Sequence, residues 1–278
     1  MVGISFELAK AGATVYATGR APSSREQVKG AGTLDDLVND AAKEGGKIVP
    51  VFCDHTNDRQ VKELFQQIEK EQNGRLDLLV NNAVAKRDTS GKKFYEIEDD
   101  PGYTYDVYNN CGLRGNYICS YYASRLMIPR KSGLIITVGS PGSVKYLFSV
   151  LYGVQKEAND RMISDLAIEL QGTGVYAINF HPGPVETEAS QHLISESTKQ
   201  QFANSESIYF SGRCLVKLLQ DPDYVRSQNG HVLLTGELSD RYKIEDVNGK
   251  LVKHQSQVAL RPLYDAIDKI HTRELQQQ

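Results

Sequence analysis

Short apolar runs alternate with amphipathic segments along most of the chain, and this alternation constrains the fold more than any other feature. The apolar runs lie at residues 14–18, 47–53, 76–80, 134–138, 174–180 and 231–235. Between them, residues 34–44, 58–72, 103–128, 154–170 and 207–219 have apolar side chains at helical spacing. Continuous apolar strands separated by helices are typical of a parallel sheet covered on both faces. The sequence therefore predicts an α/β fold.

Length and composition favour one globular domain. The chain has 278 residues, and no repeat or Pro/Gly/Ser-rich linker divides it. The alternation fades after Gly236, so we expect a domain over residues 1–240 and a polar C-terminal extension over residues 241–278. A formal net charge of −3 excludes the strongly basic surface of a nucleic-acid-binding protein. No apolar run reaches the length of a transmembrane helix and no signal-peptide pattern is present, so we expect a cytoplasmic protein.

The cysteines and histidines predict neither disulfides nor a metal site. Cys53, Cys111, Cys119 and Cys214 include no C-x-x-C pair, and no His/Cys cluster has zinc-ligand spacing. Three of the cysteines lie in apolar or helical segments. We therefore expect buried, reduced thiols and no metal ligands.

A tyrosine and a lysine four residues apart are the sharpest candidates for chemistry. Tyr152 and Lys156 lie where a helix is expected to begin, and residues four apart share a helix face. A nearby ammonium favours the phenolate and lowers the pKa of a tyrosine from about 10, which suits a general acid or base for a carbonyl or alcohol. Ser140, at the C-terminal end of the preceding strand, could hydrogen-bond the same oxygen. The alternative is a surface tyrosine over a lysine stem, because this spacing also occurs by chance.

Four motifs follow one another in a fixed order: Asn81-Asn82-Ala83-Val84, a strand ending in Gly139-Ser140, Tyr152 with Lys156, and Pro182-Gly183-Pro184-Val185-Glu186-Thr187. Together they resemble the short-chain dehydrogenase/reductase family. The resemblance covers about Gly3 to Gly236, and Asp54, an acidic residue after an earlier strand, adds to it. It implies a three-layer Rossmann-type, doubly wound parallel sheet in a single domain. The segments LRGNYICS, GSPGS and SDRYKIEDVNG resemble one subgroup of the family.

The resemblance also implies an oxidoreductase that binds a nicotinamide cofactor. Tyr152 would protonate a substrate carbonyl as hydride arrives, Ser140 would orient and polarise that carbonyl, and Lys156 would lower the tyrosine pKa and hold the nicotinamide ribose. The remaining cofactor contacts implied are Asp54 with the adenine, Asn82 with the adenosine side, Val185 and Thr187 with the carboxamide, and Pro182 and Gly183 in the same loop.

Arg20 closes the run TVYATG at the position where the family often selects its cofactor. A carboxylate there would bind the ribose 2′-hydroxyl of NAD, whereas an arginine suits the 2′-phosphate of NADP. We therefore expect NADP(H) rather than NAD(H). Arg25 is a competing partner for the phosphate, and a solvated loop charge is the alternative for Arg20.

The first departure from the family pattern concerns the phosphate-binding turn. The family begins with a strand and a T-G-x-x-x-G-x-G turn that approaches the pyrophosphate. Residues 2–8 instead resemble the helix that should follow this turn. We expect an N-terminally truncated fold that lacks its central first strand, so that two inner strand edges stay unpaired or are forced together. A degenerate relative is the alternative: a non-catalytic scaffold that binds no cofactor.

The second departure lies in the long helix expected over 103–128. Aligning Leu113-Arg114-Gly115 with the family's N-L-x-G places Gly112 where the family has an asparagine that supports a water relay to the lysine. Asn110 is two residues away, which is not a helical neighbour. It would substitute only if the helix is distorted there, and a polar helix face is the alternative.

Three residues between the serine and the tyrosine bear on the substrate. Tyr146, Leu147 and Phe148 would line an apolar pocket, core packing being the alternative. Such a pocket favours a small hydrophobic carbonyl compound, such as a steroid or a xenobiotic ketone or aldehyde, over a charged sugar. Ser143 competes with Ser140 for the serine role, and we prefer Ser140 because it directly follows the strand.

Further expectations concern a lid and partners. The polar stretch Glu186–Glu206, with Leu193, Ile194 and Phe202 as its few apolar residues, lies where the family has a mobile lid; an exposed helical loop is the alternative. The resemblance implies a homodimer or homotetramer through the helices at 103–128 and 154–170. It also implies association with the endoplasmic reticulum membrane for the subgroup, although no anchor is visible in the sequence.

Overall fold

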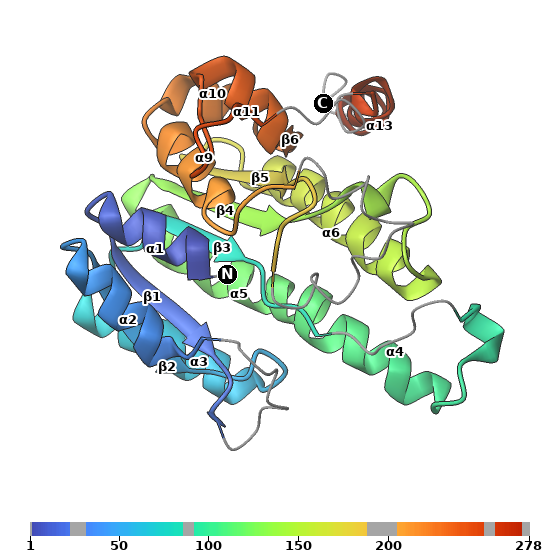
Figure 1. Ribbon diagram of the computed structural model, residues 1–278, viewed down its shortest axis with the longest axis horizontal. Helices are drawn as coiled ribbons and strands as arrows, with labels where there is room; N and C mark the ends of the chain where they lie inside the picture. Colours follow the sequence, from blue (N-terminus) through green and yellow to red (C-terminus); the bar gives the residue numbers. More distant parts are fainter. Residues whose placement is uncertain (1, 23–31, 86–91, 188–204, 253–258, 274–278) are drawn as a thin grey trace. The chain divides into compact units, whose positions relative to one another are not determined.

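A computed structural model describes residues 2–22, 32–85, 92–187, 205–252 and 259–273 (Figure 1). The chain forms two compact units. The first consists of Met1–Asp54, Pro182–Val225 and Leu234–Val258, and the second of His55–His181, Arg226–Leu233 and Ala259–Gln278.

The first unit is built on two parallel strands. These are β1 (Thr14–Gly19) and β2 (Lys47–Phe52). Helices α1 (Val2–Lys10) and α2 (Leu34–Lys43) pack on them, and α1 confirms that the chain opens with a helix where residues 2–8 were expected to form one. The apolar core that these elements share is made of Ala9, Ala17, Leu37, Ala41 and Ile48.

Three further helices follow later in the chain. They are α9 (Phe210–Leu219), α10 (Pro222–Ser227) and α11 (Thr235–Tyr242). In the first unit α9 packs against α1, where the Phe6 and Tyr209 rings meet edge to face with centroids 5.3 Å apart. Gly3 lies so close to the Ile208 carbonyl that any side chain would collide with the backbone there. The glycine therefore permits the close approach of the two helices.

The second unit contains four strands in the order β3 (Leu78–Asn81), β4 (Gly133–Val138), β5 (Val175–His181) and β6 (Val232–Leu234). The β3–β4 and β4–β5 pairs are parallel. Central residues of β4 and β5 are buried, which agrees with strands covered on both faces. The helices of this unit are α3 (Asp58–Glu71), α4 (Pro101–Asn109), α5 (Gly115–Met127), α6 (Val150–Glu169) and α13 (Arg261–Arg273). The predicted α/β class and the alternation of elements are confirmed.

The strands form two hydrogen-bonded sheets rather than one. Among the residues that the structure describes, β1 has β2 as its single strand neighbour and β3 has β4. Each unit therefore contains its own parallel sheet. The arrangement of the inner edges of a sheet without its central first strand stays a prediction.

A π-helical turn over Asn110–Arg114 separates α4 from α5, so the prediction of one continuous helix over 103–128 is wrong in its middle. The Gly115 N–H bonds to the Asn110 carbonyl, five residues back. Side chains of α6 bind carbonyls on this stretch: the Gln155 amide donates to Tyr108 O, and Asn159 Nδ2 donates to Gly112 O at 2.9 Å. These bonds satisfy buried carbonyls where the helical ladder is irregular.

The C-terminal helix α13 is docked on the second unit. Tyr264 is buried, Arg261 donates to Val232 O at 2.9 Å, and Asp268 pairs with His231 at 2.7 Å. The polar C-terminal extension expected over residues 241–278 thus contains a packed helix. Arg261, Tyr264 and Asp268 lie on one face of α13 and make its contacts. The domain boundary at residue 240 stays a prediction; it falls within α11.

The cysteines are reduced in this structure. None of the four cysteines forms a disulfide; Cys111 is half-buried and the other three are buried. Across the described ranges, no helix combines the length and apolar character that a membrane-spanning segment needs.

Asn159 provides a test of the packing between α6 and the π-turn. Replacing Asn159 with alanine should lower the free energy of unfolding by about 1–3 kcal/mol, because buried partners on Gly112, Asn116 and Gln155 lose their hydrogen bonds. Urea denaturation measures this change. The matched control is Asn39→Ala on the exposed face of α2, which should stay within about 0.5 kcal/mol of the unmodified protein. Equal effects of the two substitutions would contradict the assignment.

Candidate active site

Helix α6 positions the candidate catalytic tyrosine and lysine. The Ser149 hydroxyl caps the helix by accepting a hydrogen bond from the Tyr152 N–H at 3.2 Å. Tyr152 therefore lies in the first turn, and Lys156 and Asp160 follow on the same face at intervals of four residues. The strand β4 ends at Val138, just before Ser140, and α6 also packs on β5 (Figure 1).

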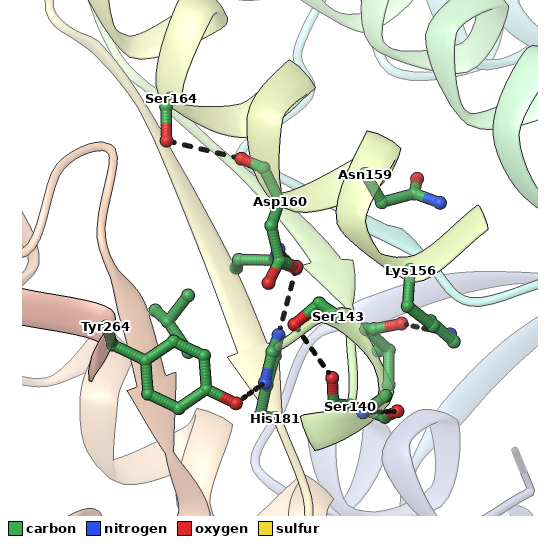
Figure 2. Close-up of polar contacts among 12 residues, drawn as sticks. Ser140, Ser143, Lys156, Asn159, Asp160, Ser164, His181 and Tyr264 are labelled. Carbon is green, nitrogen blue, oxygen red and sulfur yellow. Dashed lines mark hydrogen bonds and ion pairs between the residues drawn. The ribbon is translucent and has the colours of Figure 1, made fainter. Parts of the chain in front are cut away.

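Ser140 and Tyr152 are in direct contact. Their hydroxyl oxygens are 2.7 Å apart, and Ser140 Oγ also accepts the Gly142 N–H at 3.0 Å. Ser143 directs its hydroxyl elsewhere and donates to the Ser140 carbonyl at 3.1 Å (Figure 2). A side chain at Gly142 would collide with the Tyr152 ring, so the glycine lets the loop approach the tyrosine. The geometry therefore favours Ser140 over Ser143 as the partner of Tyr152.

The Lys156 ammonium is enclosed between α6 and the end of β4. It donates to Val138 O at 2.9 Å and lies 5.8 Å from the centre of the Tyr152 ring. Burial lowers the pKa of Lys156 to about 8, and the Asp160 carboxylate opposes this shift. The ammonium is consequently protonated at neutral pH and loses its proton in mildly alkaline solution.

The pKa of Tyr152 is shifted in the direction opposite to the one expected from the nearby Lys156 ammonium. Burial raises the pKa of Tyr152 above its ordinary value, and the hydrogen bond with Ser140 only partly offsets this effect. The physical reason is that desolvation of the phenolate outweighs its polar contacts. The tyrosine is therefore a protonated hydroxyl at neutral pH in this structure.

The residues expected to bind the cofactor follow strand ends, as their sequence positions predict. In the first unit, Arg20 directly follows β1 and is exposed, and Asp54 lies two residues after β2 and is half-buried. In the second unit, Asn82 directly follows β3. Arg25 lies outside the described residues.

The loop of Pro182, Gly183, Val185 and Thr187 belongs to the first unit and is held by Glu206. The buried Glu206 carboxylate accepts the Gly183 N–H at 2.7 Å and a hydrogen bond from the Thr235 hydroxyl. Backbone bonds join Glu206 N–H to Pro184 O and Glu186 N–H to Glu206 O. Sequence reasoning missed this role, because Glu206 is one charged residue in a polar stretch and nothing local distinguishes it. Most of the expected lid, including Leu193, Ile194 and Phe202, lies outside the described residues.

The π-turn bears on the expected water relay. A side chain at Gly112 would meet the Gln155 amide, so the turn leaves little room for one at this position. Asn110 was expected to take the place of the family's relay asparagine only if the helix is distorted there. The π-turn begins at Asn110. The structure meets that condition, while a relay through Asn110 stays a prediction.

Aromatic side chains lie on the exposed side of Tyr152. The Phe148 ring meets the Tyr152 ring edge to face, with centroids 5.0 Å apart. Phe148 is 65% exposed and Tyr146 is 73% exposed, whereas Leu147 is half-buried. Core packing was the alternative to a pocket lining for these residues, and it is wrong for Tyr146 and Phe148 because both rings are exposed.

Within the described residues, no group of three His, Cys, Asp or Glu side chains is arranged to hold a metal ion.

Comparisons with known proteins agree with this geometry. The family model of short chain dehydrogenases matches residues 2–198. The chain belongs to the short-chain dehydrogenase/reductase family. It is 42% identical over 265 residues to dehydrogenase/reductase SDR family member 1 of Mus musculus, covering 90% of this chain and 80% of the mouse protein. The Homo sapiens protein of the same name is 41% identical over the same shares.

A solved structure extends the likeness to the fold. A short-chain type dehydrogenase/reductase from Mycobacterium marinum superposes with a TM-score of 0.68 at 20% identity, over 84% of this chain and 88% of the other. The predicted Rossmann-type fold is thereby confirmed. As a member of this family, the chain is an oxidoreductase of the nicotinamide-dependent class.

Phe148 has a backbone conformation that can be tested. Its φ of 62° lies in the left-handed region, which is unfavourable for a bulky residue. Phe148→Gly should therefore be about 1 kcal/mol more stable than Phe148→Ala in thermal or urea unfolding, since both lose the ring but only glycine relieves the strain. At Val144, where φ is −112°, the order should reverse, with alanine more stable than glycine. The same order at both positions would rule out the strained backbone.

Proposed function

We propose that this chain is an NADPH-dependent reductase of carbonyl groups on small hydrophobic compounds, such as steroids or xenobiotic ketones and aldehydes. The observation that carries the proposal is the 2.7 Å contact between the Tyr152 and Ser140 hydroxyls, with Lys156 one helical turn further along the same face of α6. This arrangement places a proton donor, a second hydroxyl and a cation together at the C-terminal end of β4, where ligands bind in open α/β sheets.

Tyr152 acts as the acid in the proposed reaction. Its raised pKa keeps the hydroxyl protonated before the reaction, so a proton is available for the substrate oxygen. Ser140 donates a hydrogen bond to that oxygen and favours the charge that develops on it. The Lys156 ammonium then stabilises the phenolate that remains, and solvent returns the proton. The nicotinamide cofactor, when bound, supplies the hydride that adds to the carbonyl carbon.

Lys156 also fits a role in holding the nicotinamide ribose. An ammonium has three N–H donors, and in the described part of the chain Lys156 uses one of them, toward Val138 O. The remaining donors of an enclosed ammonium suit the adjacent hydroxyls of a ribose. Asp54, Asn82 and the loop Pro182–Thr187 are the further residues that would hold the cofactor; Glu206 keeps that loop in shape.

The substrate class follows from the surroundings of Tyr152. Phe148 and Tyr146 present exposed aromatic rings next to the tyrosine, and exposed aromatic surface of this kind favours apolar ligands. We therefore place a hydrophobic ketone or aldehyde ahead of a charged sugar.

Tyr152→Phe tests the catalytic assignment. Loss of the hydroxyl removes the proton donor, so NADPH oxidation with a steroid or aromatic ketone should fall about 10²–10⁴-fold. Binding of NADPH, followed by fluorescence titration, should change little. Tyr176→Phe on β5 is the matched control, because its hydroxyl contacts Arg226 and lies away from Ser140; it should retain activity. Full turnover by Tyr152→Phe would exclude the assigned role.

Arg20→Ala tests the cofactor preference. An exposed arginine after β1 would make charge-assisted hydrogen bonds to the 2′-phosphate, so its loss should weaken NADPH binding about 10–100-fold and leave NADH binding unchanged. Arg130→Ala, another exposed arginine outside the site, serves as the control. An equal effect on both cofactors would refute a role in selecting NADPH.

A non-catalytic scaffold is the second candidate. The titrations above separate the two functions, since a scaffold of this kind binds neither NADPH nor NADH. Association into a homodimer or homotetramer is compatible with the exposed Tyr117 and Tyr121 on α5 and stays a prediction, as do cytoplasmic location and contact with the endoplasmic reticulum.

A further inference from the structure

Glu206 lies beside the loop 182–187 and is bonded to it through both its backbone and its side chain. Its N–H donates to Pro184 O at 2.7 Å and its carbonyl accepts the Glu186 N–H at 2.9 Å, so the two segments form a short parallel bridge. The carboxylate accepts the Gly183 N–H at 2.7 Å. Because backbone N–H groups can only donate, the direction of these three bonds is fixed.

The Glu206 carboxylate is completely buried, and Thr235 completes the cluster around it. Thr235 begins α11 and is also buried. Its hydroxyl donates to the same oxygen of Glu206 that accepts the Gly183 N–H, and its own oxygen lies 3.3 Å from that N–H. Burying a carboxylate is unfavourable unless hydrogen-bond donors surround it. The donors that satisfy Glu206 therefore also fix where the Gly183 backbone can lie.

A second buried carboxylate, Asp246, fixes the residue that follows Glu206. One oxygen of Asp246 accepts the Ser207 N–H at 2.7 Å, and the other accepts the Val247 N–H at 2.7 Å and the Ser207 hydroxyl at 2.5 Å. The Asp246 N–H donates to Lys250 O at 2.8 Å. Both carboxylate oxygens thus accept from a backbone N–H. An amide side chain cannot reproduce this pattern, because one end of an amide carries only donors.

These bonds form a continuous path from residues 244–252 to the loop 182–187. Asp246 binds Ser207, Ser207 follows Glu206 in the chain, and the Glu206 carboxylate binds Gly183. Every residue of this path belongs to the first compact unit. A change at Asp246 is therefore expected to reach the Gly183 backbone through Ser207 and Glu206.

We propose that Glu206 and Asp246 are positioning residues for the nicotinamide end of the cofactor, because together they fix the backbone of the loop 182–187. This inference rests on the proposed function, in which that loop holds the cofactor. A loop that is ordered before its ligand arrives binds more tightly, since binding then carries a smaller loss of conformational entropy. The two carboxylates thus contribute to affinity for the nicotinamide and not to affinity for the adenosine half.

The first experiment measures amide hydrogen exchange in the full chain without cofactor. Glu206→Gln should increase the exchange rate of the Gly183 N–H about tenfold, since a bond to a charged acceptor becomes a weaker bond to a neutral one. Asp246→Asn should increase the same rate by a similar factor, because the amide loses one of the two backbone N–H bonds. Asp240→Asn, which changes an exposed carboxylate on α11, is the matched control and should keep the rate within about twofold.

The amides of β2, in the same unit, report any general loss of stability. They should exchange at the same rate in both variants as in the unmodified protein. An equal rise at Gly183 and in β2 would mean that the substitutions only destabilise the unit, and it would overturn the proposal. An unchanged Gly183 rate in both variants would overturn it as well.

The second experiment uses calorimetric titration with two ligands, NADPH and 2′-phospho-ADP-ribose, which lacks the nicotinamide. Glu206→Gln and Asp246→Asn should each weaken NADPH binding about tenfold and leave binding of 2′-phospho-ADP-ribose within about twofold, because only NADPH carries the group that meets the loop. Asp240→Asn should change neither affinity. Equal weakening of both ligands by Glu206→Gln would indicate a general defect of the fold and would overturn the positioning role.

The two experiments separate this inference from the proposed function. If the unmodified protein binds NADPH and both variants bind it equally well, the reductase stands and the positioning role fails. If the unmodified protein binds neither ligand, the reductase and the cofactor role fail together. A raised Gly183 exchange rate would in that case still show that the two carboxylates order the loop.

Discussion

The enclosure of the Lys156 ammonium is the constraint on which the rest of the site depends. A cation removed from water is unfavourable unless polar groups surround it, and here the Val138 carbonyl meets it at 2.9 Å. This bond is possible only if the end of β4 and the second turn of α6 lie at a fixed distance. The same fixed distance brings Ser140, two residues beyond Val138, to the Tyr152 hydroxyl. The packing of α6 against the end of β4 that gives Lys156 its hydrogen bond to Val138 O therefore also brings the Tyr152 and Ser140 hydroxyls together.

Helix α6 carries polar side chains on two adjacent faces. Tyr152, Lys156 and Asp160 form one row, while Gln155 and Asn159 form a buried row that binds carbonyls of the interrupted helix α4–α5. A helix whose buried positions were all aliphatic could not satisfy the carbonyls around the π-turn. The irregular turn and the polar stripe of α6 thus depend on each other, and together they fix the orientation of the helix that carries the site.

Much of this arrangement is local enough to be predicted. The alternation of strands and helices and the helical spacing of Tyr152 and Lys156 follow from short stretches of sequence, and the structure confirms them. The helix expected over residues 2–8 from the resemblance to the family is also present, as α1. The choice of Ser140 over Ser143 followed from its place directly after a strand and agrees with the contacts observed. By contrast, the helix over 103–128 was expected to be continuous, because nothing in its own residues reveals that Gln155 and Asn159 will bind its carbonyls.

The sequence by itself determined the class of fold and the order of its elements, since these depend on periodicity within single helices and strands. It also supplied candidate residues for chemistry, from the spacing within one helix and from the resemblance to the family. Tertiary structure decided the rest: that Glu206 holds the loop at Gly183, that α13 brings Tyr264 to His181, and that the pKa of Tyr152 rises rather than falls. Each of these depends on contacts between groups that are far apart in the chain, and the pKa of Tyr152 depends in addition on how far those groups exclude water. Desolvation is a property of the folded surroundings, and no single segment of the chain encodes it.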